Sequence, residues 1–172
     1  MKAKIVGTCA IAAAAIALSS LAAGGAKMKI TSSAFQEGGN IPSQFTCDGA
    51  NVNPPLHIDQ VPAGAKSLAL IVDDPDAPGG TFVHWLVWNI DPKTTDIAEN
   101  SVPPNAVQGK NGFGKTGYGG PCPPSGTHRY YFRVYALDVA QVQGGSTRAD
   151  LERAMQGHII GQGQLMGRYS KK

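Results

Sequence analysis

The sequence has little charge and no run of basic residues. Asp, Glu, Lys and Arg together make up 16% of its 172 residues, and the net charge is only +3. Proteins that bind nucleic acid normally carry a cluster or stripe of Lys and Arg on one face. The basic end, Lys171–Lys172, has the pattern of a solvated tail and is too short to be such a patch. The composition therefore argues against a nucleic-acid partner.

Spacings typical of metal and hydrolytic sites are also absent. The histidines never occur as His-x-His or His-x-x-x-His, and no Gly-x-Ser-x-Gly segment is present. Zinc sites commonly take two ligands at such short spacings, and α/β-hydrolases carry their nucleophile in the serine motif. Ser125, close to His128, is better explained as a loop serine. We therefore expect no metal, no cofactor and no catalytic residue, and a hydrolase is the weakest of the functions considered.

No apolar run is long enough to span a membrane. The longest, Ile5–Leu18, is shorter than the roughly 20 residues that a spanning helix needs, and it follows Lys2 and Lys4. A basic start, a short apolar run and then small residues are the features of an export signal. Cleavage suits three positions, after Ala22, after Ala23 or after Ala26. The alternative is an uncleaved membrane anchor.

Export decides how the cysteines are interpreted. Cys9 lies inside the apolar run and would leave with residues 1–26. Residues 27–172 then form the mature chain, one domain of ordinary size in the periplasm or outside the cell. Cys47 and Cys122 remain in an oxidising compartment, where we expect a disulfide between them; the alternative is two separate buried thiols. In the chain-entropy model, closing so long a loop contributes about 4–5 kcal/mol at most.

Strand patterns dominate the rest of the chain. Three segments are apolar, β-branched or aromatic, with Gly and Pro between them: Ser67–Val72, Phe82–Ile90 and Tyr130–Leu137. Gly163–Tyr169 is a further candidate strand. This pattern favours antiparallel sheets with long loops over alternating βαβ units, and neither a repeat nor a second domain is evident.

One helix stands out near the C-terminus. Thr147 and Asp150 form a start like a capping box, with Asp in place of the usual Glu. The residues that then recur at helical spacing are Leu151, Ala154, Met155 and His158. Either Gly157 or Gly161 can end the helix. We interpret Met155 as a core residue.

The first of two polar segments, Asp73–Pro78, is acidic and contains two prolines, and His84 follows it by a few residues. In an extended chain the side chains of Asp74 and Asp76 point to the same side. They can then form one wall of a pocket. The local alternative is a β-turn in which these side chains accept hydrogen bonds from backbone amides.

The second polar segment, Gly119–Tyr130, combines Gly, Pro, Cys, His and Tyr. If its end is a strand, His128 and Tyr130 share one face and Arg129 points to the other. Two side chains can then line a pocket while Arg129 forms a structural ion pair.

In order and content these two segments resemble the signature motifs of the phosphatidylethanolamine-binding protein (PEBP) family, also called the Raf kinase inhibitor protein family. Asp74–Pro78 resembles the family's Asp-Pro-Asp-Ala-Pro motif, and the second segment resembles its Gly-x-Pro-Pro-x-Gly and His-Arg-Tyr motifs. Upstream, Cys47–Leu56 is similar to the bacterial Raf kinase inhibitor-like branch. The resemblance extends from about Ile30 to the C-terminus.

This resemblance implies a mainly β, PEBP-like fold of two packed antiparallel β-sheets, with one or two peripheral helices and a small anion-binding pocket. The pocket residues that it implies are Asp74, Asp76, His84, Gly120, Pro123, Pro124, His128 and Tyr130. Imidazole, phenol and backbone N–H groups would donate hydrogen bonds to phosphate or carboxylate oxygens. Two roles stay open for the aspartates: they orient the imidazoles and keep them cationic, or they bind the ammonium group of an ethanolamine headgroup.

The segments around the pocket mouth are shorter than in vertebrate members of that family. Only Thr127 separates Gly126 from His128, and the loop after Pro78 is short. We therefore do not carry over the ligand preference of those members.

The resulting expectation is an exported, non-catalytic protein that binds a small anion such as phosphate or a phospholipid headgroup. The alternative is a protein-interaction regulator, for example a protease inhibitor, whose partner the sequence does not identify. A homodimer also stays open, although no dimer seam is visible in the sequence.

Overall fold

The computed structural model describes residues 25–171. The predicted export signal, its Cys9 and the cleavage positions after Ala22 and Ala23 lie outside these residues, so they stay predictions. Within residues 25–171, no helix is both long enough and apolar enough to cross a membrane.

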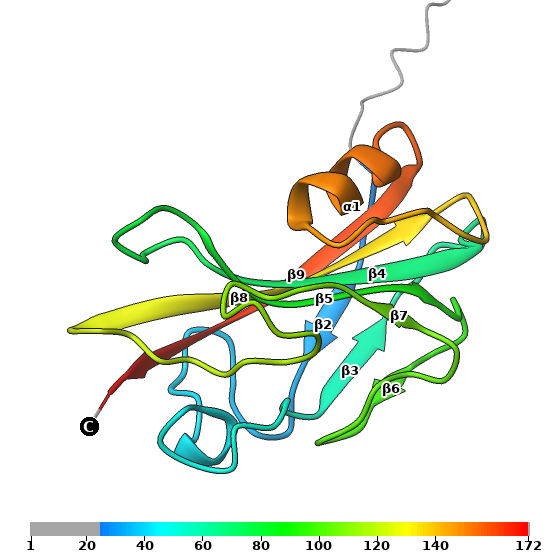
Figure 1. The fold of residues 1–172 in the computed structure, drawn as a ribbon. Helices are drawn as coiled ribbons and strands as arrows, with labels where there is room; N and C mark the ends of the chain where they lie inside the picture. The colour runs from blue at the N-terminus through cyan, green and yellow to red at the C-terminus, as the bar shows by residue number, and fades with distance from the viewer. Residues whose placement is uncertain (1–24, 172) are drawn as a thin grey trace, which may run out of the picture.

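A six-stranded sheet forms the middle layer of the fold (Figure 1). Its strands, in spatial order, are β1 (Ala26–Lys27), β9 (Ile159–Ser170), β8 (Thr127–Leu137), β4 (Ser67–Asp74), β5 (Phe82–Ile90) and β7 (Val107–Gln108). Neighbouring strands are antiparallel except for β1 and β9, which run parallel. All the segments predicted as strands are confirmed, and each falls within a strand of this sheet.

A smaller antiparallel sheet packs against one face of the large sheet, and helix α1 (Arg148–Met155) lies on the other face (Figure 1). The small sheet contains β2 (Lys29–Thr31), β3 (Leu56–Asp59) and β6 (Asp96–Ile97). A short 3₁₀ helix, η1 (Ser43–Phe45), connects β2 to β3. The predicted mainly β fold of two packed sheets with a peripheral helix is therefore confirmed.

Helix α1 begins with the predicted capping box. The Thr147 side chain accepts a hydrogen bond from the Asp150 backbone N–H, and the Asp150 carboxylate accepts one from the Thr147 backbone N–H. The helix ends at Met155, and Gly157 follows with a φ of 82°, a left-handed conformation that glycine adopts without strain. His158 lies beyond this end, so the helix is shorter than its side-chain spacing predicted.

The core forms on both faces of the large sheet. Phe132 and Val134 of β8 point toward the small sheet and are fully buried. On the opposite face, Leu151 and Met155 of α1 belong to a second buried cluster with Leu86 of β5. Met155 is therefore a core residue, as predicted. The large sheet is thus a rigid platform, and the loops at its ends take their positions from it.

The first described residues pack tightly against β9. Ala26 pairs with Gly161, and the Met28 backbone N–H donates to the Gln162 carbonyl at 2.8 Å. A Cβ atom added to Gly163 would lie 2.5 Å from the Met28 carbonyl oxygen, so the backbones approach too closely for any side chain. Ala26 is therefore part of the large sheet.

We expect Gly163→Ala to lower the free energy of unfolding by about 1–3 kcal/mol, because the new methyl group meets backbone atoms that have nowhere to move. Urea denaturation measures the loss. Gly79→Ala is the matched control, because a Cβ there contacts nothing within 4 Å and Gly79 has no left-handed φ. Equal stabilities of the two variants would contradict the close approach of β9 to residue 28.

Candidate functional site

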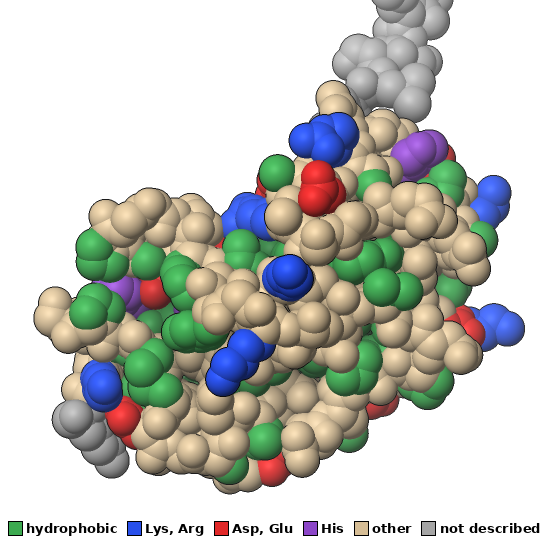
Figure 2. Space-filling view, viewed as in Figure 1, with side chains coloured by type: hydrophobic (Ala, Val, Ile, Leu, Met, Phe, Trp, Pro, Cys, Tyr) green, Lys and Arg blue, Asp and Glu red, His purple; other side chains and the backbone are tan. Residues whose placement is uncertain are grey.

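A pocket of about 280 Å³ lies at the end of the large sheet where β4 stops. At the left of Figure 2, beside the loop that follows β4, histidine and acidic side chains are visible among hydrophobic ones. The residues that line the pocket are Asp74, Ala77, Pro78, Gly79, Gly80, Thr81, Phe82, His84, Phe113, Cys122 and Pro124. Of the eight residues predicted for the site, Asp74, His84 and Pro124 line this pocket directly.

Asp74 and His128 form a buried pair beside the pocket. Asp74 is the last residue of β4 and His128 is near the start of β8, the strand next to it in the sheet. The His128 Nδ1 atom lies 2.7 Å from Asp74 Oδ2, and both side chains are less than one-tenth exposed. Asp74 therefore fixes the orientation of this imidazole, one of the two roles left open for the aspartates.

Asp76 is engaged by Arg129 and contacts no imidazole. Arg129 donates from its backbone N–H and from Nε to Asp76 Oδ2, each at 2.9 Å, and from its guanidinium to Oδ1 at 2.6 Å. These hydrogen bonds lower the pKa of Asp76 to about 2. The predicted structural ion pair of Arg129 is present, and its partner is Asp76. Asp76 does not line the pocket, and its assignment to ligand binding stays a prediction.

His84 is buried and neutral near pH 7. Its Nδ1–H donates to the Gly119 carbonyl oxygen at 2.5 Å, and only 2% of the residue is exposed. Burial lowers the pKa of this imidazole below 6.5, and the Gly119 carbonyl opposes the shift only in part. Because Nδ1 carries the proton, Nε2 is a hydrogen-bond acceptor. At His84 desolvation outweighs the nearby carboxylates, which argues against the open alternative that the aspartates keep this imidazole cationic.

Tyr130 lies behind His84 with its hydroxyl group buried. The two rings meet edge to face, with centroids 5.2 Å apart. Burial first, and then the negative charge of Asp74, raises the pKa of the Tyr130 phenol. Within residues 25–171 the hydroxyl group makes no hydrogen bond, although Asp74 and the Cys122 backbone are nearby. A buried phenol is normally bonded, so this hydroxyl group is an exception among the buried side chains of residues 25–171.

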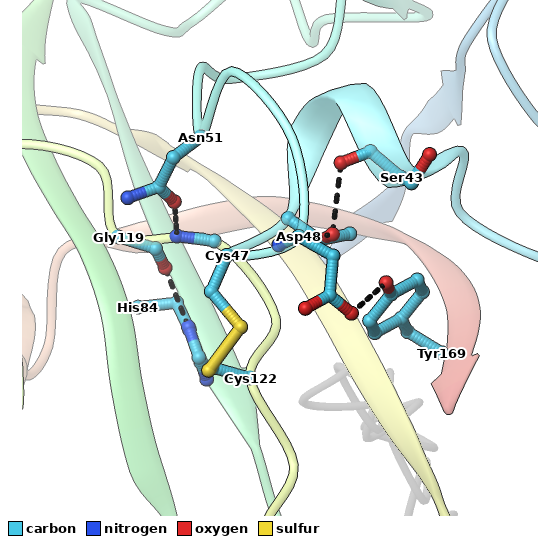
Figure 3. Close-up of a disulfide and its surroundings, with 10 residues drawn as sticks. Ser43, Cys47, Asp48, Asn51, His84, Gly119, Cys122 and Tyr169 are labelled. Carbon is cyan, nitrogen blue, oxygen red and sulfur yellow. Dashed lines mark hydrogen bonds between the residues drawn. A yellow bond between two sulfur atoms is a disulfide. The ribbon is translucent and has the colours of Figure 1, made fainter. Parts of the chain in front are cut away.

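The segment predicted as the pocket rim is held by a second loop, as Figure 3 shows. Cys122 lines the pocket and forms the predicted disulfide with Cys47. The Gly120 backbone N–H donates to Asn51 Oδ1 at 2.7 Å. Gly120 and Pro123 are not among the lining residues, and their assignment to ligand binding stays a prediction.

Two aromatic side chains that sequence reasoning missed form the apolar wall of the pocket. The Phe82 and Phe113 rings pack edge to face with centroids 4.8 Å apart, and Phe113 also lies 5.8 Å from the His84 ring. Phe82 could have been found, because it shares a strand face with His84 at a spacing of two residues. Phe113 comes from a Gly-rich loop, and no local pattern marks it.

Within residues 25–171, no group of three or more His, Cys, Asp or Glu side chains is placed to hold a metal ion. The site is therefore described by its hydrogen-bonding groups alone: a carboxylate–imidazole pair, a neutral imidazole and a phenol beside an aromatic wall.

Two packed β-sheets with a small, partly polar pocket at one end of the larger sheet define the class of fold to which this domain belongs. The family model described as phosphatidylethanolamine-binding protein matches residues 31–170. This chain therefore belongs to the phosphatidylethanolamine-binding protein family.

Relatives and solved structures agree with this assignment. A UPF0098 protein of Methanothermobacter thermautotrophicus is 49% identical over 150 residues, which cover 84% of this chain and 99% of the relative. A second UPF0098 protein, from Archaeoglobus fulgidus, is 51% identical, and the match spans only 52% of its length. Among solved structures, the PEBP homologue CT736 of Chlamydia trachomatis has 46% identity and a TM-score of 0.80, with 85% of this chain and 99% of that one covered. Escherichia coli YbcL has 33% identity and a TM-score of 0.79, with 86% and 100% covered.

We expect acid to destabilise the fold through His84. Its pKa is lowered in the folded state, so the unfolded chain binds the proton more readily as the pH falls below 6.5. The stabilising effect of the neutral imidazole is complete above that pH and is lost below it. The variant His84→Gln keeps an N–H for the Gly119 carbonyl. Between pH 7 and pH 5 it should lose less stability than wild type, and the difference is at most about 1.4 kcal/mol per pH unit.

Chemical denaturation across this pH range measures the difference. His57→Gln is the control, because His57 is exposed and paired with Asp96 away from the pocket. A pH dependence of His84→Gln that matches wild type would contradict a neutral, buried His84.

Proposed function

We propose that this protein is exported and binds a small anionic ligand, such as phosphate or a phospholipid headgroup, without acting on it chemically. The observation that supports this best is the buried Asp74–His128 pair beside the neutral imidazole of His84 and the unpaired hydroxyl of Tyr130. All four groups meet at one end of the sheet, at or next to a pocket large enough for a headgroup.

The charges of the pocket favour a ligand that carries a proton or a cation besides its anionic group. Tyr130 is a donor for an oxyanion, as is the Nε2–H of His128 when that ring is protonated. The unprotonated Nε2 of His84 and the carboxylate of Asp74 instead accept hydrogen bonds. A phosphate ester with an ammonium arm satisfies both kinds of group, whereas a bare dianion meets Asp74 unfavourably.

A protein-interaction role is the second candidate. Phe113 stands at the pocket wall with 49% of its surface exposed, although large apolar side chains are usually buried. A partner that covers the pocket mouth would bury it. An unidentified regulatory partner, such as a protease, and a second copy of this chain both remain within this alternative.

Titration calorimetry with phosphate, phosphoethanolamine and ethanolamine tests the binding proposal. We expect wild type to bind phosphoethanolamine most tightly and His128→Ala to lose at least about tenfold in affinity, because a charged hydrogen bond contributes about 1.5–3 kcal/mol. His57→Ala, an exposed histidine outside the pocket, is the matched control. Absence of heat with all three probes would reject the ligand role, and hydrolysis of the phosphoester that His128→Ala abolishes would make the protein an enzyme.

Export is tested by mass and redox state. When the full chain is expressed in a bacterium, we expect the periplasmic protein to lack the N-terminal signal and to contain the Cys47–Cys122 disulfide, seen as a two-dalton gain after reduction. A chain without residues 2–24 should stay in the cytoplasm with free thiols. A full-length, reduced protein in the cytoplasm would contradict export.

A further inference from the structure

A second hollow has a volume of about 260 Å³. It borders the same loop, residues 117–124, that carries the rim of the first pocket. Gly117 and Tyr118 line this hollow, whereas Cys122 and Pro124 line the first pocket. None of the residues that line the hollow is charged. An ionic ligand would lose its hydration there without gaining a counter-charge, so the hollow suits a neutral one.

Two side-chain amides in this hollow have fixed orientations. Asn51 Oδ1 accepts from the Gly120 backbone N–H at 2.7 Å, and Gln108 Oε1 accepts from Trp85 Nε1 at 2.8 Å. With each oxygen occupied, each amide offers its NH₂ group. Neither NH₂ group donates a hydrogen bond to another residue within 25–171, and in Figure 3 the dashed line at Asn51 ends on its oxygen and none ends on its nitrogen.

The wall behind these amides is rigid and offers an acceptor. Asn53 is 4% exposed, and its side chain donates to the Ala98 carbonyl at 2.9 Å while accepting from the Ser101 backbone N–H at 3.0 Å. The Ser101 hydroxyl donates to the same Ala98 carbonyl, which leaves its oxygen free to accept. The hollow therefore presents fixed donors and an acceptor, an arrangement that reduces the entropy cost of binding.

We infer that this hollow is a binding site for a neutral saccharide or polyol. Hydroxyl groups both accept and donate, so one sugar ring can accept from the Asn51 and Gln108 amides and donate to Ser101. Five separate chain segments surround the hollow, which suits a compact ring better than an extended peptide. The site is distinct from the anion pocket, and the inference does not depend on the function proposed for that pocket.

The two tryptophans give a direct readout. The Trp85 indole N–H is bonded to Gln108 in the hollow, whereas Trp88 lies in a different depression of the surface. In ¹H–¹⁵N spectra of the mature protein, titration with glucose or N-acetylglucosamine should shift the Trp85 indole signal saturably and leave the Trp88 signal in place. Trp88→Phe assigns the two signals.

Isosteric variants separate the binding role from the structural one. Asn51→Asp and Gln108→Glu keep the oxygens that hold Gly120 and Trp85 but remove the NH₂ donors, and each should weaken sugar binding by about tenfold. Asn105→Asp is the control, because Asn105 has a similar left-handed φ, 62° against 58° for Asn51, and lies outside the hollow.

Three results would overturn the inference. These are an unmoved Trp85 signal at saturating sugar, an equal loss in Asn105→Asp, and a Trp85 shift produced by a neutral dipeptide amide but by neither sugar.

Discussion

The crossing of two loops, residues 44–51 and 117–122, is the constraint on which both hollows depend. A disulfide joins the loops, the Cys47 backbone N–H donates to the Pro121 carbonyl, and the Tyr118 hydroxyl donates to the Phe45 carbonyl at 3.0 Å. A Cβ atom on Gly120 would lie only 2.4 Å from that same carbonyl oxygen, so the crossing closes only around a glycine. The position of the neighbouring Gly119 carbonyl, and with it the tautomer of His84, follows from this packing.

The acidic motif distributes its three carboxylates among three different tasks. Asp73 points to the face of the large sheet that carries α1. There it is almost fully buried between Arg133 and Arg148, and it ties α1 to β4. Asp74 points to the other side and orients His128, and Asp76 is neutralised by Arg129. Asp73 and Asp76 are thus paired with arginines, and Asp74, which faces the pocket, is paired with a histidine. This sorting leaves the pocket with a carboxylate–imidazole pair in place of a carboxylate–guanidinium pair.

The period of two residues along a strand predicted the site wherever the chain remains a strand. It placed Arg129 opposite His128 and Tyr130 in β8, whereas β4 and β5 were located by their apolar and β-branched composition. The two-residue period failed for Asp76, because β4 ends at Asp74. The Asp76 backbone N–H turns back and donates to Asp74 Oδ1. This is the contact of the β-turn that was the local alternative for the acidic segment. Residues brought in from distant loops, such as Phe113 and Asn51, carry no local signal, because only the closure of the whole fold places them.

Gly119 and Gly120 are adjacent, yet each is bonded to a residue on a different side of the loop. The Gly119 carbonyl accepts from His84 of the first pocket, and the Gly120 N–H donates to Asn51 of the second hollow. A ligand that fixes the position of His84 or of Asn51 therefore acts on the same short backbone segment, Gly119–Gly120. Any coupling between two such ligands must be equal in both directions, because it is a single free energy shared by both binding events.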